Sequence, residues 1–481
     1  MLRRSTASGF LWLMVQSLSG RVATFFSQII LAKFLLPQAF GQIGLAYTVT
    51  ALVSVFISFG VDDILLQRLR ALDLWVTPAF WSSLGLALIG MTLMLLAAPA
   101  AASIYGSPGL VGLIAVLAVS VPLSALSTIP VVKLRVAMDF RFVATYTAVE
   151  TVAVQLASII LAFGGFGAYS FVIPLPVAAA VKAAVFWRKA PTRIRSRYRR
   201  WQFTYIIRNG FILLATRIVI ETVNQGDYVV LGLMTTSASV GIYFFAFRLA
   251  AQPLRMLAGN FGTVLFPALT QLRADPTRQV RAALQASRIL AYTVTPVCFL
   301  QAALAGPVLH LMFGARWNGA IPLVQVLSLG LPGDAIAWIA GALLVARREF
   351  WRDFIYLCIF APPFFISVFI GSYFGSSLGV AIAVSLYYAM IKPLNSWLVF
   401  RSDMRAADFM HIYISPPLLS GLAIGAAYES SEFLANSDNL IAQIAVRVTV
   451  GLLVYLAILH LLVPKILRQV FDRFPLGGVD G

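Results

Sequence analysis

The chain has 481 residues, of which 60% are hydrophobic and 11% are charged, and its formal net charge is +18. Soluble domains carry about 25% charged residues, so this composition excludes a soluble globular protein. Nucleic-acid binding is also a poor interpretation of the positive charge. The Lys and Arg residues lie in short connections between apolar segments, where the positive-inside rule of membrane proteins accounts for them.

Fourteen segments are apolar and long enough to cross a bilayer, which takes about 20 residues per helix. In chain order they are 10–34, 42–66, 78–102, 110–132, 143–164, 168–187, 206–233, 240–266, 284–311, 320–345, 354–374, 377–400, 411–428 and 440–463. The first follows Arg3 and Arg4 but lacks a small-residue cleavage site, which predicts an uncleaved helix rather than a signal peptide. We therefore expect an all-α polytopic membrane protein.

The basic residues lie mainly on every second connection between the predicted spans, and therefore on one side of the membrane. If the N-terminus is cytoplasmic, the basic connections all fall on the cytoplasmic side: around 68–70, 133–141, 188–200, 273–281, 347–352, 401–405 and 465–473. The opposite side receives only Lys33 and Arg316. This asymmetry predicts a multi-pass protein of the bacterial inner membrane with both termini in the cytoplasm.

The longest charged stretch, RKAPTRIRSRYRRW at 188–201, divides the helices into six and eight. Its expected role is topological, with some attraction to anionic lipid headgroups, worth about 1 kcal/mol per basic residue. It separates four predicted regions. They are an N-terminal six-helix bundle (1–187), a basic cytoplasmic linker (188–205), a C-terminal six-helix bundle (206–405), and two further transmembrane helices with a cytoplasmic tail (406–481).

The two bundles resemble each other weakly. The segments 31–47 and 231–247 each join the first two helices of a bundle, and they carry Gly41 and Gly241 at equivalent places. Both bundles begin on the same side of the membrane. The repeat is therefore parallel, as in transporters whose two halves rock about a central site.

Several short motifs, taken in order, resemble one family. They are LLPQAFG (35–41), LRVAMDFR (134–141), DYVVLGLMTTSASVGIY (227–243), FPALTQLR (266–273) and FGARW (313–317). The chain looks like the polysaccharide-transporter, or Wzx-like oligosaccharide flippase, family, within the superfamily that also contains multidrug extruders and the lipid II flippase. One departure is Gln38-Ala39, where family members often have an acidic residue.

The resemblance implies a fold and a cargo. The fold would be two six-helix bundles forming a V around a central cavity. The cargo would be an oligosaccharide linked to undecaprenyl pyrophosphate, moved from the cytoplasmic to the periplasmic leaflet. The expected partners are this lipid-linked oligosaccharide, membrane lipids and other polysaccharide-assembly proteins.

Polar stripes inside two spans point to an anionic cargo. In the first span Arg21 and Gln28 share a face, and in the eighth Arg248, Gln252 and Arg255 follow each other at helical spacing. Arginine offers a planar fork to phosphate oxygens. These residues are therefore candidates for substrate binding.

The seventh span holds further charges that leave two interpretations open. Arg217 and Glu221 are four residues apart, a spacing that allows them to pair within the helix. The alternative is that Arg217 faces the cargo. Glu221 and Asp227 are alternatively the structural partners of the arginines in the eighth span, and Glu221 is also a candidate for binding a coupling cation. Asp227, at the start of a family-like motif, is structural, an ion ligand or both.

Isolated acids in other spans are candidate sites for a coupling cation, H+ or Na+. Glu150 is one, and Asp334 is the other, since Pro332-Gly333 before it should weaken the helix and expose carbonyl groups. The alternative for Asp334 is a hydrogen bond to a neighbouring helix. Lys182, Lys392 and Arg447 are expected to extend toward the membrane surfaces.

The sequence also separates competing functions. It holds no nucleotide-binding, metalloprotease or hydrolase motif, so we expect no enzyme activity, no cofactor and no metal. The first span lacks the acidic residue that many proton-coupled multidrug extruders carry, which favours an anionic cargo over a cationic drug. The alternatives are a drug or metabolite antiporter and a lipid II flippase on the same fold.

Overall fold

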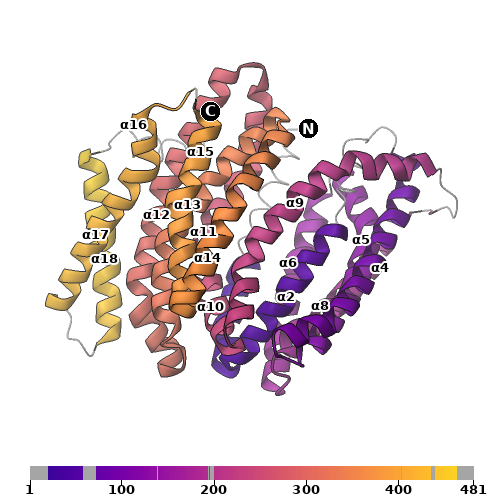
Figure 1. The fold of residues 1–481 in the computed structure, drawn as a ribbon, viewed down its shortest axis with the longest axis horizontal. Coiled ribbons are helices and arrows are strands. Elements are labelled where there is room, and N and C mark those ends of the chain that lie inside the picture. Colours follow the sequence, from indigo (N-terminus) through magenta and orange to yellow (C-terminus); the bar gives the residue numbers. More distant parts are fainter. Residues whose placement is uncertain are drawn as a thin grey trace. The chain divides into compact units, whose positions relative to one another are not determined.

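A computed structural model gives the fold and describes residues 20–57, 72–137, 139–192, 194, 200–401, 403–434 and 439–462 (Figure 1). Within these ranges the chain is almost entirely helical and contains no strand. Every predicted span lies mostly on helix wherever it falls in the described residues. The all-α prediction is therefore confirmed.

The described chain forms two compact units. Unit 1 comprises Met1–Phe244 and Leu357–Ser377, and unit 2 comprises Phe245–Tyr356 and Leu378–Gly481. The contacts thus group the seventh predicted span with the N-terminal spans. The predicted division at 188–205 and the V-shaped arrangement stay predictions.

The helices of unit 1 begin with residues 20–34. They continue with α2 (Pro37–Ile57), α4 (Leu72–Ile104), α5 (Leu110–Val136), α6 (Phe140–Phe163), α7 (Tyr169–Val172), α8 (Pro174–Lys189), α9 (Arg200–Met234) and the first half of α10 (Ser237–Ala250). The middle of α14 (Phe350–Leu386) also belongs to this unit. Helix α5 packs against both α4 and α8, and α2 packs on α9.

Unit 2 contains the remaining helices. They are α11 (Gln252–Gln271), η2 (Leu272–Ala274), α12 (Pro276–Phe313), η3 (Gly314–Trp317), α13 (Ala320–Arg347), η4 (Tyr387–Ile391), α15 (Lys392–Phe400), α16 (Ala406–Phe409), η5 (Met410–Ile414), α17 (Ser415–Leu434) and α18 (Leu440–Leu462). Its main core lies between α12 and α13, where Leu290, Ile339 and Leu343 are buried together. Helices α17 and α18 pack on each other and on α12.

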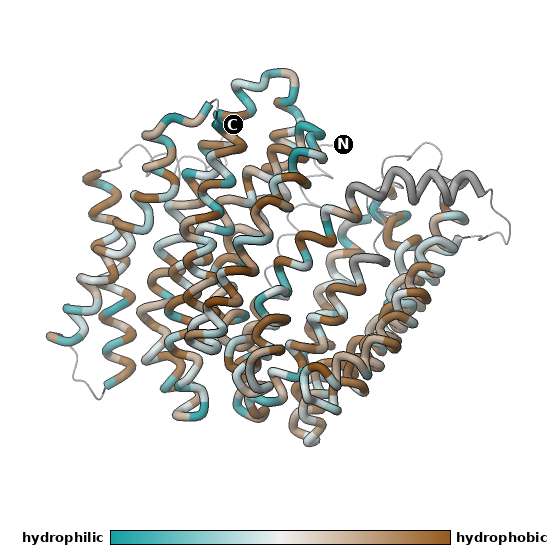
Figure 2. Tube along the Cα trace, in the orientation of Figure 1, coloured by the Kyte–Doolittle hydropathy of each residue, from teal (hydrophilic) through white to brown (hydrophobic). Residues whose placement is uncertain are grey.

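Nine helical segments among the described residues are long and apolar enough to cross a membrane. Figure 2 shows apolar residues along the helices, with hydrophilic stretches mainly where helices join. Many large apolar side chains are exposed on these segments, such as Leu96, Phe374 and Leu453. In a membrane such side chains face lipid, so the chain is a multi-pass membrane protein.

The predicted boundary between spans 354–374 and 377–400 appears as a kink rather than a loop. Helix α14 contains the first span and continues into the second as far as Leu386, and within it only Ser376 has non-helical dihedrals (φ 53°, ψ −136°). A non-glycine residue with positive φ is uncommon. After α14 the chain continues as a short π-helix, η4, directly before Lys392.

Helix caps lie in one of the family-like motifs, 134–141, and just after another, 266–273. Asp139 accepts a hydrogen bond from the Phe142 N–H at 3.3 Å and begins α6. Asp275 accepts one from the Arg278 N–H at 3.0 Å and begins α12, with Pro276 in the first position. Both use the preference of Asp for the N-cap, which explains why the chain turns here.

The two equivalent glycines of the repeat meet in unit 1. A Cβ atom on Gly41 would overlap the Ser237 carbonyl, and one on Gly241 would overlap the Pro37 carbonyl. The contact is reciprocal, because each glycine lies against the residue four positions before the other. Only glycine lets α2 and α10 approach this closely.

Candidate functional site

The candidate cargo residues Arg21 and Gln28 lie on the helical segment 20–34 of unit 1. Gln28 is buried and Arg21 is half-buried. Arg217, on α9 of the same unit, is exposed. The structure thus places three of the predicted polar side chains in unit 1 at different degrees of burial.

The eighth predicted span is broken into α10 and α11 at Ala251. Pro253 explains the break, since proline lacks an N–H and its ring clashes with the carbonyl four residues earlier. That carbonyl belongs to Leu249, and it accepts a hydrogen bond from Gln301 Nε2 at 2.8 Å instead. The break interrupts the predicted polar stripe between Arg248 and Arg255.

The three cargo candidates of this span differ in exposure. Arg248, in the last turn of α10, is half-buried, Gln252 is buried and Arg255 is exposed. All three belong to unit 2, whereas Arg21 belongs to unit 1. Their convergence on one central cavity stays a prediction.

Asp227 is a buried carboxylate on α9 with partners from its own unit. The Tyr243 hydroxyl of α10 donates to its Oδ2 at 2.7 Å, and the Tyr228 N–H donates to its Oδ1 at 2.9 Å. Asp227 therefore ties α9 to α10 close to the glycine contact. Glu221, one and a half turns earlier, is half-buried.

Glu150 is not an isolated acid, so that prediction was wrong. Lys182 Nζ of α8 donates to Glu150 Oε2 of α6 at 2.9 Å. Lys182, which was expected to extend toward the membrane surface, is therefore paired with an acid of a neighbouring helix. An unpaired charge inside a membrane is costly, and this pair within unit 1 removes the cost.

Asp334 is likewise paired, which corrects its prediction as an isolated acid. Lys392 Nζ of α15, which was expected to extend toward the membrane surface, lies 2.9 Å from Asp334 Oδ1 of α13. The expected weakening at Pro332-Gly333 is absent, because α13 runs unbroken through both residues. The alternative, a hydrogen bond to a neighbouring helix, is what the structure shows.

Arg447 on α18 is buried, whereas the sequence predicted that it would extend to the outer surface. Its Nε donates to Ser431 Oγ at 3.0 Å and its Nη1 to the Ala303 carbonyl at 2.8 Å. The guanidinium also lies 3.8 Å from the centre of the Tyr428 ring. Arg447 thus joins α18 to α17 and α12.

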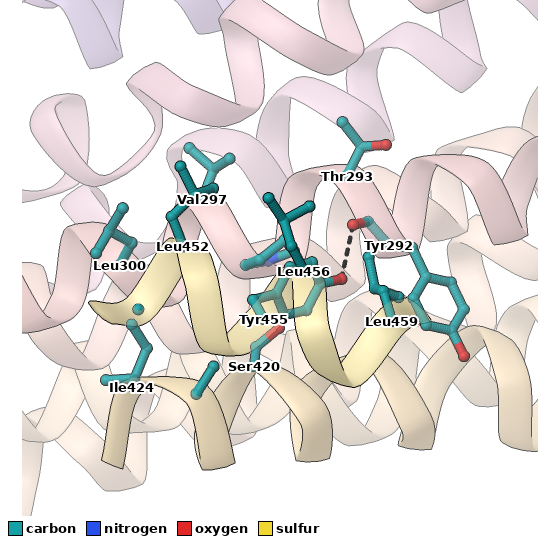
Figure 3. Close-up of a pocket in the computed structure, with 13 residues that line it drawn as sticks. Tyr292, Thr293, Val297, Leu300, Ser420, Ile424, Leu452, Tyr455, Leu456 and Leu459 are labelled. Atoms are coloured by element: carbon teal, nitrogen blue, oxygen red, sulfur yellow. Dashed lines mark hydrogen bonds between the residues drawn. The ribbon is translucent and has the colours of Figure 1, made fainter. Parts of the chain in front are cut away.

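An apolar pocket of about 240 Å³ lies between α12, α17 and α18 in unit 2 (Figure 3). Val297, Leu300, Ile424 and Leu456 are among the residues that line it. Among its few polar groups, the Tyr455 hydroxyl donates to the Tyr292 carbonyl at 2.8 Å. Such a lining suits hydrocarbon rather than a charged group.

The described residues contain no group of three or more His, Cys, Asp or Glu side chains that could hold a metal ion.

The partners of the three acids could not be found from spacing along the chain: Tyr243 for Asp227, Lys182 for Glu150 and Lys392 for Asp334. One signal was available. Each of these acids lies in an apolar span, and acids there are expected to pair with a residue on a neighbouring helix.

The fold and its internal charges define the chain as a polytopic helical membrane transporter. It belongs to the polysaccharide biosynthesis protein family, whose profile matches residues 30–322. It is 24% identical to the succinoglycan biosynthesis transport protein ExoT of Rhizobium meliloti (strain 1021), over 92% of this chain and 90% of that protein. It is 19% identical to the teichuronic acid biosynthesis protein TuaB of Bacillus subtilis (strain 168), over 87% and 89%.

A solved structure supports the fold over nearly the full length. The lipid II flippase MurJ, in an inward closed conformation, matches with a TM-score of 0.78 at 16% identity. The match covers 95% of this chain and 100% of that one. At this identity the likeness shows the fold alone; the family that the motifs indicated is confirmed by the profile match.

Proposed function

We propose that the protein is a flippase that moves an undecaprenyl-pyrophosphate-linked oligosaccharide from the cytoplasmic to the periplasmic leaflet by alternating access. Membership of the polysaccharide biosynthesis family carries this proposal. The name of the relative ExoT, a biosynthesis transport protein, and the flippase fold support it. The protein would lie in the bacterial inner membrane with both termini in the cytoplasm and would make or break no covalent bond.

The cargo residues we propose are those of the polar stripes: Arg21, Gln28, Arg217, Arg248, Gln252 and Arg255. Guanidinium groups bind the oxygens of a pyrophosphate in two-pronged geometry and keep their charge at physiological pH. A cationic drug would be repelled by them. The arginines of the polar stripes therefore favour an anionic lipid-linked cargo over the cationic drug of the antiporter alternative.

A deletion strain of the source bacterium tests the proposal. Loss of the chain should reduce surface polysaccharide and leave the carrier-linked oligosaccharide on the cytoplasmic leaflet, where a glycosidase added to spheroplasts cannot reach it. Re-expression should restore both. Normal periplasmic exposure of the oligosaccharide without the chain would refute the proposal, and accumulation of lipid II instead would favour the lipid II flippase.

A further inference from the structure

The apolar pocket between α12, α17 and α18 lies at the lipid-facing surface of these helices (Figure 3). Three of its lining side chains are partly exposed, with exposed fractions of 41% for Val297, 52% for Leu452 and 40% for Leu456. None of the thirteen described residues that line the pocket carries a charge. A hydrocarbon chain of the surrounding bilayer can therefore enter the pocket from the side without meeting a charged group.

Fixed contacts hold the three helices around the pocket. Beyond one end of it, the Arg447 guanidinium of α18 donates to Ser431 of α17 and to the Ala303 carbonyl of α12. Toward the other end, the Tyr455 hydroxyl of α18 donates to the Tyr292 carbonyl of α12. The pocket thus has walls that are held by protein contacts. Such walls suit a resident chain rather than a cargo that has to move past them.

A cation lies next to the pocket on the side where α12 begins. Arg288 precedes the lining residue Tyr292 by one turn of α12, and 30% of its side-chain surface is exposed. Its Nη2 pairs with Asp408 Oδ1 of α16 at 2.6 Å. A guanidinium has five N–H donors, so this pair leaves other donors of Arg288 for a second acceptor.

The spacing of Arg288 and the pocket fits the build of a phospholipid. Val297 follows Arg288 by nine residues on α12, which is about 13 Å along an α-helix. Each polar interface of a bilayer is about 5–7 Å thick. When Arg288 contacts a lipid phosphate, Val297 and the pocket around it therefore lie at the depth of the acyl chains.

We propose that the pocket and Arg288 form a binding site for a resident phospholipid with an anionic headgroup. Its acyl chain fills the pocket, and its phosphate accepts charge-assisted hydrogen bonds from the Arg288 guanidinium. The lipid then joins α17 and α18, which lie outside the two predicted six-helix bundles, to α12. Only the leaflet, which is the cytoplasmic one in the proposed orientation, rests on the proposed function.

Thermal unfolding of the full-length protein, delipidated in detergent, tests the inference with two added phospholipids that carry the same oleoyl chains. Phosphatidylglycerol is anionic, and phosphatidylcholine has no net charge. Wild type should gain at least about 2 °C more from phosphatidylglycerol than from phosphatidylcholine, because a ligand that binds only the folded state stabilises it.

Gly451→Leu tests the role of the pocket. A Cβ atom on Gly451 would lie 3.6 Å from Ile424 Cδ1 and 3.7 Å from Leu300 Cδ1, so a leucine would extend among the lining residues and occupy the space. This variant should lose the extra gain from phosphatidylglycerol, and Val297→Phe provides a second test if it does not fold. Gly85→Leu on α4, where a Cβ atom would meet open space, is the matched control and should respond as wild type.

Two further variants separate headgroup binding from the ion pair. Arg288→Gln and Asp408→Asn both remove the pair. Only Arg288→Gln should lose the preference for phosphatidylglycerol, whereas Asp408→Asn should keep or increase it, because the guanidinium then has no competing carboxylate. If Arg288→Gln does not fold, Arg288→Lys takes its place and should show a reduced preference, since it keeps the charge but loses the planar fork.

Four results would overturn the inference. They are equal gains of wild type from both phospholipids, a full phosphatidylglycerol response or failure to fold of both pocket variants, the same preference in the Arg288 and Asp408 variants, and a larger gain from undecaprenyl phosphate than from phosphatidylglycerol. The last result would assign the pocket to the cargo carrier instead. None of these measurements involves transport, so the inference and the flippase proposal fail separately.

Discussion

At the scale of single residues, three acids inside the apolar spans contact partners on neighbouring helices. Glu150 contacts Lys182, Asp334 contacts Lys392, and Asp227 accepts from Tyr243. Because a charge in hydrocarbon costs several kcal/mol, such pairs hold helices together. Arg255 and Arg217, which we propose as cargo residues, are exposed side chains in the described structure.

The arginine stripes give the first prediction. Arg21→Ala, Arg248→Ala and Arg255→Ala should each lower surface glycan about tenfold, since a charge-assisted hydrogen bond contributes about 1.5–3 kcal/mol. The Lys variants should be intermediate, because they keep the charge but lose the planar fork. Glycan is measured at matched membrane expression, with the exposed Arg278→Ala as the control. Wild-type output from all three alanine variants would exclude a role for these cations in cargo handling.

Arg447 gives a prediction on stability. Arg447→Ala should lower the free energy of unfolding by about 1–3 kcal/mol, because the Ala303 carbonyl and Ser431 hydroxyl lose their donor in a buried place. Arg447→Lys should rescue little, since one ammonium cannot reproduce the fork and the stacking on Tyr428. Thermal unfolding of the purified variants measures this. Equal stability of the alanine variant and wild type would show that the guanidinium does not fasten α18.

At the scale of elements, close helix packing depends on glycine and breaks depend on proline. Gly41 and Gly241 let α2 and α10 meet at their backbones. Pro253 ends α10, and the freed Leu249 carbonyl is satisfied by Gln301. The sequence indicated the repeat through Gly41 and Gly241. The structure gives this repeat a physical basis, because both glycines lie in the same close contact between α2 and α10.

The glycine contact gives a third prediction. Gly41→Ala and Gly241→Ala should each destabilise the protein by about 1–3 kcal/mol, the usual cost of overpacking, because the methyl group meets a carbonyl rather than a flexible side chain. Gly85→Ala on α4 is the control, since its Cβ would meet open space and alanine favours helix. Thermal unfolding and membrane yield are compared. If Gly41→Ala matches Gly85→Ala, the close contact contributes nothing to stability.

At the scale of the whole molecule, hydropathy alone predicted the helices, because a segment of about 20 apolar residues in lipid has to be helical. It also placed the boundary of two spans near Ser376. Hydropathy could not predict the ion pairs, since the partners Glu150 and Lys182 are 32 residues apart and lie on helices whose neighbours the sequence does not specify. The same holds for Arg447, whose burial depends on α12, more than a hundred residues earlier.

The candidate site was predictable only in part, and for a similar reason. Helical spacing placed Arg248 and Arg255 on one stripe, yet Pro253 divides that stripe between two helices. The acids were correctly found in apolar spans. Their description as isolated groups failed, because sequence spacing reports neighbours within one helix and not across helices.

Membrane topology is the last prediction. The basic connections predict a cytoplasmic linker at 188–201, whereas the exposed Glu432 at the end of α17 should face the periplasm. We expect Ser196→Cys and Glu432→Cys, each in a background lacking Cys298 and Cys358, to differ in reaction with a membrane-impermeant maleimide. In intact spheroplasts only position 432 should react, and after permeabilisation both should. Labelling of 196 but not 432 before permeabilisation would invert the orientation, and with it the direction in which the protein is proposed to move its cargo.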